Sequence, residues 1–176
     1  MPVLVVPGPA APPPPPVTVE VPEAWEALPP GPDLLLVRGT GSAGDPVEVR
    51  LRPHTGPHGY AVADLLDDLG AAAARGSEVE PPFVVEIGGR EWTARNVSWD
   101  EPDGPVVEVH LATAVEPAWA GGDAPDPVAE PVEADAPDAG FTRLLLATGR
   151  VRGTGLDADY DVLQSVLETL AVGGEA

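Results

Sequence analysis

The first third of the chain alternates apolar and polar residues in a way that predicts β-strands. Residues 17–21 (VTVEV) alternate strictly, and Pro22 ends this strand before Trp25, which is predicted to lie in a turn or a short helix. Residues 33–38 (DLLLVR) form an apolar run. Residues 46–53 (PVEVRLRP) place Val and Leu on one side and Glu and Arg on the other, which predicts a strand with one face in solvent.

Two stretches repeat their apolar residues with the period of an α-helix. In residues 59–76 the aspartates lie off the apolar stripe, and Gly76 is expected to end the helix. In residues 156–172, Asp157 or Asp159 is expected to cap the first turn. The stripes consist of Val62, Leu65, Leu66, Leu69 and Ala73 in the first helix and of Tyr160, Leu163, Val166, Leu167 and Leu170 in the second.

Residues 81–115 predict three antiparallel strands joined by two tight turns. Gly88-Gly89 supply the positive φ angles of a two-residue hairpin, and residues 101–105 (EPDGP) supply the second turn. Residues 140–153 predict one more strand. Because hairpin-linked strands are interrupted by only two helices, we expect an α+β fold, with an antiparallel sheet of about six to seven strands packed with two main helices.

Two segments of biased composition flank or interrupt this domain. Residues 1–16 include five consecutive prolines and predict an extended arm, which is either a stiff spacer or a docking motif for a proline-binding partner. Residues 116–139 contain seven acidic residues, five prolines and no basic residue, so they cannot bury enough apolar surface to order themselves. We therefore expect a single domain at 17–172, with a mobile insertion, followed by a tail at 173–176.

These segments also hold the candidate partner-binding residues. Trp119 is the only aromatic residue of the acidic insertion, and it either docks onto its own domain or anchors a partner protein. Within the proline-rich arm the candidates are Pro12, Pro13 and Pro14.

The net charge and the absence of cysteine narrow the classes of function. The chain carries a formal charge of −20, with nine arginines, no lysine and twenty-nine acidic residues. Nine arginines spread among so many acids are not expected to form the basic face that phosphate backbones require, so we expect no nucleic-acid partner. Without cysteine there is no disulfide, thiolate metal site or lipid-bearing cysteine.

Targeting signals are also missing from the sequence as given. The amino terminus lacks the pattern of a signal peptide, and no apolar run reaches the roughly 20 residues that cross a bilayer. We therefore expect no membrane insertion and a cytoplasmic location.

Residues 34–46 (LLLVRGTGSAGDP) contain the G-x-G-x-x-G spacing of a dinucleotide site at Gly39, Gly41 and Gly44. Such a site needs a helix after the third glycine, whereas here an alternating strand follows. The sequence VRGTG also recurs at 151–155, before a predicted helix whose first turns contain several aspartates. We interpret the first copy as a hairpin loop, with no cofactor.

No catalytic constellation stands out, and we expect no enzyme. His54 and His58 stand four residues apart and are weak candidates for metal ligands, although Gly56 and Pro57 make a helix there improbable; the alternative is a pair of surface histidines. Trp25, Trp92 and Trp99 are expected to fill the core or its rim. A possible small-molecule pocket between sheet and helices would be lined by Phe83, Trp92 and Trp99.

Three features together resemble a known group of small α/β sandwiches. They are the opening VTVEVPEAWEAL, the helix before three strands, and the closing LDADYDVLQSVLETLAV, and they are similar to the PsbP, Mog and LpqN group, in particular to actinobacterial LpqN-like proteins. The resemblance covers residues 17–115 and 140–172. It implies a non-enzymatic protein-interaction or adaptor module, accessory to a secretion system or another multiprotein assembly. The missing leader and lipid-bearing cysteine put an envelope location in doubt.

Overall fold

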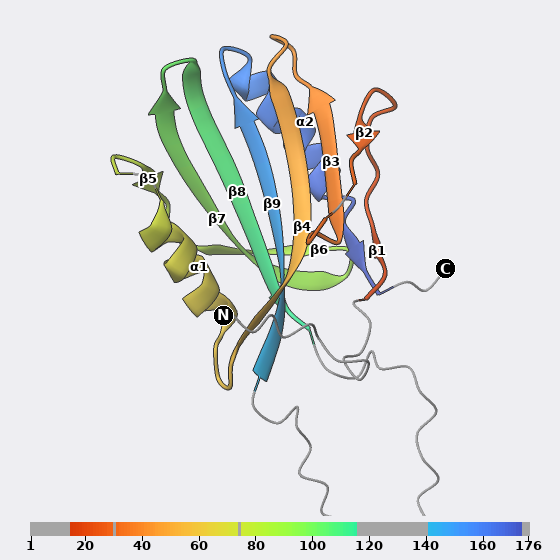
Figure 1. Cartoon of the computed structure of the whole chain (residues 1–176), viewed down its shortest axis with the longest axis vertical. Helices are drawn as coiled ribbons and strands as arrows, with labels where there is room; N and C mark the ends of the chain where they lie inside the picture. Colours follow the sequence, from red (N-terminus) through yellow and green to blue (C-terminus); the bar gives the residue numbers. More distant parts are fainter. Residues whose placement is uncertain (1–14, 30, 74, 116–140, 174–176) are drawn as a thin grey trace, which may run out of the picture.

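A computed structural model describes residues 15–29, 31–73, 75–115 and 141–173, which form antiparallel sheets and two helices (Figure 1). The α+β class expected from the sequence is confirmed, with more strands than the six to seven expected. In chain order the elements are β1 (Val17–Thr18), β2 (Glu26–Ala27), β3 (Leu35–Thr40), β4 (Pro46–Pro57), α1 (Val62–Ala72), β5 (Glu78–Val79), β6 (Phe83–Ile87), β7 (Arg90–Glu101), β8 (Gly104–Ala114), β9 (Phe141–Arg152), α2 (Leu156–Leu167) and β10 (Ala171–Val172).

The main sheet has the order β2-β3-β4-β9-β8-β7-β5, and β6 also pairs with β7. All of its pairs are antiparallel, and β9 lies in the middle between β4 and β8. The apolar run at residues 144–147 is buried because β9 is covered on both faces, with alternate residues contacting opposite layers.

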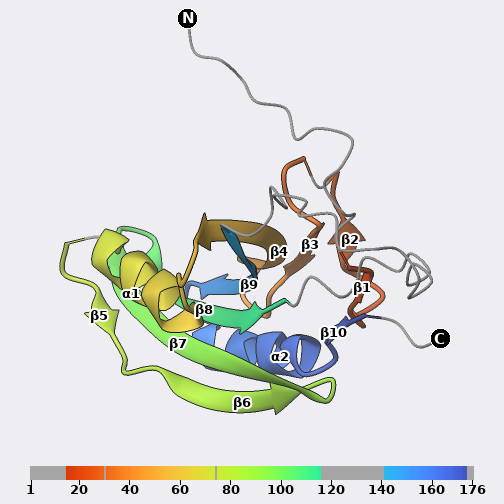
Figure 2. The same ribbon diagram turned by 90° about the horizontal axis from the view of Figure 1, so that it is seen from below.

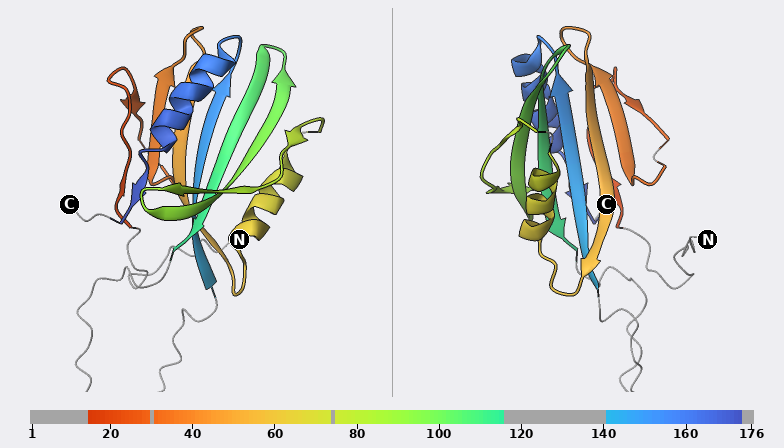
Figure 3. Two further views of the ribbon diagram at one scale, coloured as in Figure 1. Left: turned by 180° about the vertical axis from the view of Figure 1, so that it is seen from behind. Right: turned by 60° about the vertical axis from the view of Figure 1, so that its left-hand side comes forward.

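The larger core lies between one face of the sheet and α2. Leu163, Val166 and Leu167 of the helix pack with inward residues of β4, β7, β8 and β9. A Cβ atom on Gly149 would stand 2.6 Å from Leu163 Cδ1, so the glycine in β9 allows the helix to approach the sheet. Figure 3 shows α2 lying across this face, with β6 curling beneath it.

The smaller core lies on the opposite face, where α1 packs (Figure 2). Leu65 and Leu66 contact alternate residues of β8 and β9. The helix start is fixed by Asp64, whose Oδ2 accepts a hydrogen bond from the Ala61 N–H at 2.8 Å. Tyr60 packs against Leu-rich α1 at the same end. Helix α1 covers part of β7, β8 and β9 and leaves the rest of this face uncovered among the described residues.

Several boundaries differ from those expected. Strand β4 continues to Pro57, and α1 stops at Ala72 because Ala73 already has an extended ψ of 150°. The segment at 156–172 is a helix only to Leu167. After it Leu170 turns into the core, and β10 pairs with β1, which is limited to two residues. Around Trp25 the chain makes a turn and then β2.

Candidate functional site

The glycine loop between β3 and β4 packs against the start of α2. The Ser42 N–H donates to Asp159 Oδ1 at 2.6 Å, and Asp159 is only 3% exposed. A Cβ atom on Gly41 would stand 2.1 Å from Asp159 Oδ2, and one on Gly155 would stand 2.2 Å from Ser42 Oγ. Glycine is needed at both positions because the two segments approach too closely for a side chain. These glycines belong to the two VRGTG copies, which meet at this contact.

Gly39 and Gly44, the other two glycines of the G-x-G-x-x-G spacing, also have structural roles in the hairpin. Gly39 makes room for Trp25, because a Cβ atom there would stand 2.1 Å from the indole Nε1. Gly44 adopts a φ of +90° in the turn, and the Gly41 N–H donates to the Asp45 carbonyl at 2.7 Å. The hairpin interpretation is confirmed, since β4 follows the loop directly.

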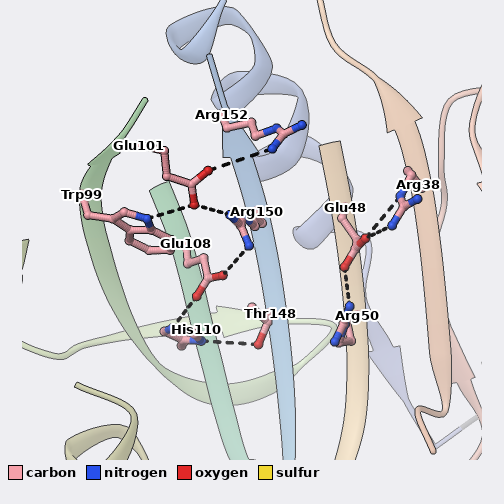
Figure 4. A network of polar contacts seen from close by, with 10 residues as sticks. All are labelled: Arg38, Glu48, Arg50, Trp99, Glu101, Glu108, His110, Thr148, Arg150 and Arg152. Atoms are coloured by element: carbon pink, nitrogen blue, oxygen red, sulfur yellow. Dashed lines mark hydrogen bonds and ion pairs between the residues drawn. The ribbon is translucent and has the colours of Figure 1, made fainter. Parts of the chain in front are cut away.

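A polar surface, here called the open face, occupies the part of the sheet opposite α2 that α1 leaves uncovered (Figure 4). It forms because the outward positions of β3, β4, β7, β8 and β9 alternate with core positions. Its side chains are Arg38, Glu48, Arg50, Arg52, Trp99, Glu101, Glu108, His110, Thr148, Arg150 and Arg152. Five of the nine arginines therefore lie on one face of the sheet, where they alternate with glutamates.

Opposite charges alternate from strand to strand across the open face. Arg38 of β3 lies opposite Glu48 of β4, which lies opposite Arg150 of β9, which lies opposite Glu108 of β8. Glu48 accepts hydrogen bonds from Arg38 Nη2 at 2.7 Å and from Arg50 Nη2 at 2.6 Å. Cross-strand pairs of this kind stabilise a sheet and hold each guanidinium in place.

Aromatic and acidic neighbours fix the arginines of β9. Arg150 Nη2 lies 2.8 Å from Glu101 Oε1, and its guanidinium carbon is 5.4 Å from the centre of the Trp99 ring. The Trp99 Nε1–H donates to the same Glu101 oxygen at 3.2 Å. Arg152 Nη1 stands 4.0 Å from the other Glu101 oxygen.

Burial and charge shift the pKa values on this face in different directions. Burial opposes ionisation of Glu48, but hydrogen bonds from Arg38 and Arg50 outweigh it and lower the pKa. Burial raises the pKa of Glu108, partly offset by Arg150. Burial, aided by the charge of Arg95, lowers the pKa of His110 to about 4. His110 is therefore neutral at pH 7, and its 3.4 Å contact with Glu108 is not an ion pair.

A second surface, here called the apolar edge, lies along β6. This strand pairs with β7 on one side only, and no described strand covers its other side. Phe83 and Val84 are 42% and 61% exposed, although they are large and apolar. Beside them lies a hollow of about 270 Å³ between α2 and strands β6 to β8. Its lining includes Phe83, Val85, Ile87, Tyr160, Gln164 and Leu167.

The structure does not bring Phe83, Trp92 and Trp99 into one pocket. Trp92 is 1% exposed and belongs to the core beneath α2. Trp99 lies seven residues along β7 and faces the opposite side of the sheet, where it contacts Arg150. Phe83 alone lines the hollow at the apolar edge. Trp25 packs at the rim of the larger core.

The two candidate histidines lie at the end of β4 and in the turn after it. His54 stacks on the Tyr60 ring with the centroids 5.7 Å apart, and Gly56 leaves room for the same ring. His58 is exposed in the turn. Within the ranges that the structure describes, no group of three or more His, Cys, Asp or Glu side chains is placed to hold a metal ion. Pro12, Pro13, Pro14 and Trp119 lie outside the described residues.

Sequence reasoning missed the open face. A signal for it exists, because Arg50 and Arg52 alternate in one strand while Arg150 and Arg152 alternate in another. Neither segment alone shows that these two strands pair with each other.

The architecture defines an α+β sandwich with one helix on each face of an antiparallel sheet. Its fold is LpqN-like: the chain is similar to the crystal structure of LpqN, described as involved in cell envelope biogenesis of Mycobacterium tuberculosis, with a TM-score of 0.62. The two share 13% sequence identity, and the alignment covers 94% of this chain and 87% of the LpqN chain. The expected fold resemblance is thereby confirmed. Comparisons of the sequence with known protein families and with curated proteins find no match.

Neither of the two described helices is long and apolar enough to cross a membrane.

Proposed function

We propose that this chain is a non-catalytic interaction module that binds an extended segment of a partner protein along β6. The observation that carries the proposal is the apolar edge, an unpaired strand with exposed Phe83 and Val84 beside a hollow. An exposed strand with free backbone groups is a template for strand addition, and natural proteins usually protect such edges with charge or proline.

The register of the β6–β7 hairpin identifies the backbone groups that a partner would use. Ile87 lies opposite Arg90 across the two-residue turn, so these two residues exchange hydrogen bonds with each other. The alternate residues Val84 and Glu86 therefore direct their N–H and C=O groups away from β7. An added strand would bond to those groups and direct every second side chain towards the hollow under α2.

The surroundings of the hollow favour a partner segment with particular chemistry. Glu86 and Glu168 line the hollow itself. A neighbouring hollow of about 470 Å³, which shares Tyr160, is lined by further acids including Glu80 and Asp157. An apolar segment flanked by lysine or arginine would complement both the apolar lining and the acidic rim.

The wider role that we propose is accessory. LpqN is described as involved in cell envelope biogenesis, which is compatible with a module that serves a larger assembly. The fold likeness alone supports this part of the proposal. The cytoplasmic location and the absence of catalysis stay predictions; cell fractionation tests the first.

Selection of peptides from a random display library on the immobilised chain tests the proposal. We expect enriched peptides with alternating apolar residues flanked by basic ones. Val84→Pro removes the outward N–H at an edge position where proline is tolerated, whereas Val84→Thr keeps it. The proline variant should lose the selected peptides and the threonine variant should keep them. Equal binding by both variants, or no enrichment, would contradict strand addition.

A second candidate function is the binding of a small apolar molecule in the hollow. The apolar lining with Tyr160 and Gln164 as polar groups favours it, although about 270 Å³ is at the lower end for ligand pockets. Val85→Phe should fill the hollow while leaving the backbone edge free. A fragment such as indole would then lose its binding while a selected peptide kept part of its affinity.

A further inference from the structure

We propose that the open face binds a compact oxyanion with two or more negative charges, a phosphate compound or a polycarboxylate. The site is a hollow of about 420 Å³ over β3, β4 and β9, here called the arginine hollow. Its lining consists of Arg38, Pro46, Glu48, Arg50, Arg150 and Arg152. The lining itself carries four positive charges and one negative, while Asp33, Glu101 and Glu108 pair with the same arginines from outside the lining.

The carboxylates that pair with these arginines are less exposed than the arginines. The four arginine side chains are 37 to 53% exposed, whereas those of Glu48, Glu101 and Glu108 are 18 to 30% exposed. A solute that reaches this face therefore meets more guanidinium surface than carboxylate surface.

The guanidinium groups keep hydrogen-bond donors that their carboxylates do not use. Each guanidinium has five N–H donors in a fixed fork that matches carboxylate and phosphate oxygens. Glu48 engages two nitrogens of Arg38 and one of Arg50. Arg152 approaches Glu101 only to 4.0 Å.

Two of the guanidinium groups are held in place by neighbouring side chains. Arg150 is held between Glu101 and the Trp99 ring, and Arg38 by two bonds to Glu48. Binding would then order few side chains, which removes a cost that flexible arginines carry. Strands in a sheet are about 4.8 Å apart, so the arginines of three adjacent strands lie close together. Such a group suits a small ion with several negative charges better than an ion with a single charge.

The negative charge of the rest of the chain favours a small anion over a large one. At physiological salt, screening limits the range of each charge's electrostatic interaction to about 8 Å. A compact ion in the hollow therefore interacts mainly with the nearby guanidinium groups. An acidic protein would contact the surrounding negative surface as well and would be repelled.

Isothermal titration of the full chain with pyrophosphate and with citrate, each against sodium chloride of equal ionic strength, tests this site. We expect at least one of the two to bind, and which one binds identifies phosphate or carboxylate as the source. Arg152→Gln and Arg38→Gln should each weaken binding about fivefold, the size of an exposed charge pair. Arg75→Gln removes the same charge from an exposed position elsewhere and should have no effect.

Three results would overturn the proposal. One is no heat from either anion beyond that of sodium chloride. Another is an equal loss in Arg75→Gln, which would mean a general charge effect. The third is binding of a hexaglutamate peptide without binding of either small anion, which would assign the face to a macromolecule. Val84→Pro should leave anion binding unchanged, so this test is separate from that of the apolar edge.

Discussion

Replacement of Gly41 by alanine tests the contact between the two VRGTG copies. The backbone at Gly41 is not in the left-handed region, so alanine can adopt it. The new Cβ atom would stand 2.1 Å from Asp159 Oδ2 and must displace a buried carboxylate that accepts the Ser42 N–H. Overpacking costs about 1–3 kcal/mol and a hydrogen bond to a charged group about 1.5–3 kcal/mol. Alanine recovers about 0.4–1 kcal/mol by restricting the unfolded chain.

The net expectation for Gly41→Ala is a loss of about 3.5 kcal/mol in the free energy of unfolding, or about 10 °C in Tm. Urea unfolding followed by tryptophan fluorescence measures it. In an Asp159→Ala background the space is empty, so the same change should cost less than about 0.5 kcal/mol. Gly44→Ala is the control, because its cost comes from a φ of +90° and should not depend on Asp159. Equal losses for Gly41→Ala in both backgrounds would refute the contact.

Buried His110 should make stability depend on pH. Its pKa falls from 6.5 to about 4 on folding, so between these values only the unfolded chain gains the proton, and wild type should lose up to about 3 kcal/mol relative to His110→Gln as pH falls. Urea unfolding at each pH checks this, and parallel curves for the two proteins would contradict it. The hydrogen bond to Asp68, with burial, raises the pKa of Tyr60 to about 12, so Asp68→Asn should return its titration towards 10 in ultraviolet absorbance. An unchanged titration would exclude that bond. Gly149→Ala forces a Cβ atom to 2.6 Å from Leu163 and should lower Tm by several degrees, whereas Gly89→Ala meets no atom and tests only backbone strain.

The elements that could be predicted from the sequence are those whose pattern is complete within one segment. The hairpin at Gly88-Gly89 and the stripe through Leu65 and Leu66 are such patterns, and both are confirmed. Of the strand predicted at 17–21, only Val17–Thr18 forms β1. Strand β10 could not be predicted, because two residues carry no period and the strand exists only through its pairing with β1. The open face could not be predicted either, because Glu48 and Arg150 become neighbours only when β4 and β9 pair.

The contact at Asp159 shows another limit of sequence reasoning. Its carboxylate was expected to serve the start of α2, yet it accepts a hydrogen bond from the loop at Ser42. A buried acid and a solvated acid have the same sequence signature at a helix start. Only the approach of the β3–β4 loop distinguishes them.

The central position of β9 has a consequence for how the chain is assembled. The strands before it form two separate groups, β2 to β4 and β5 to β8, and neither is joined to the other until β9 has been synthesised. During synthesis, β4 and β8 therefore expose unpaired edges that invite pairing between growing chains. A strong negative charge keeps such unfinished chains apart. The excess of acidic residues thus also opposes association of chains that have not yet folded.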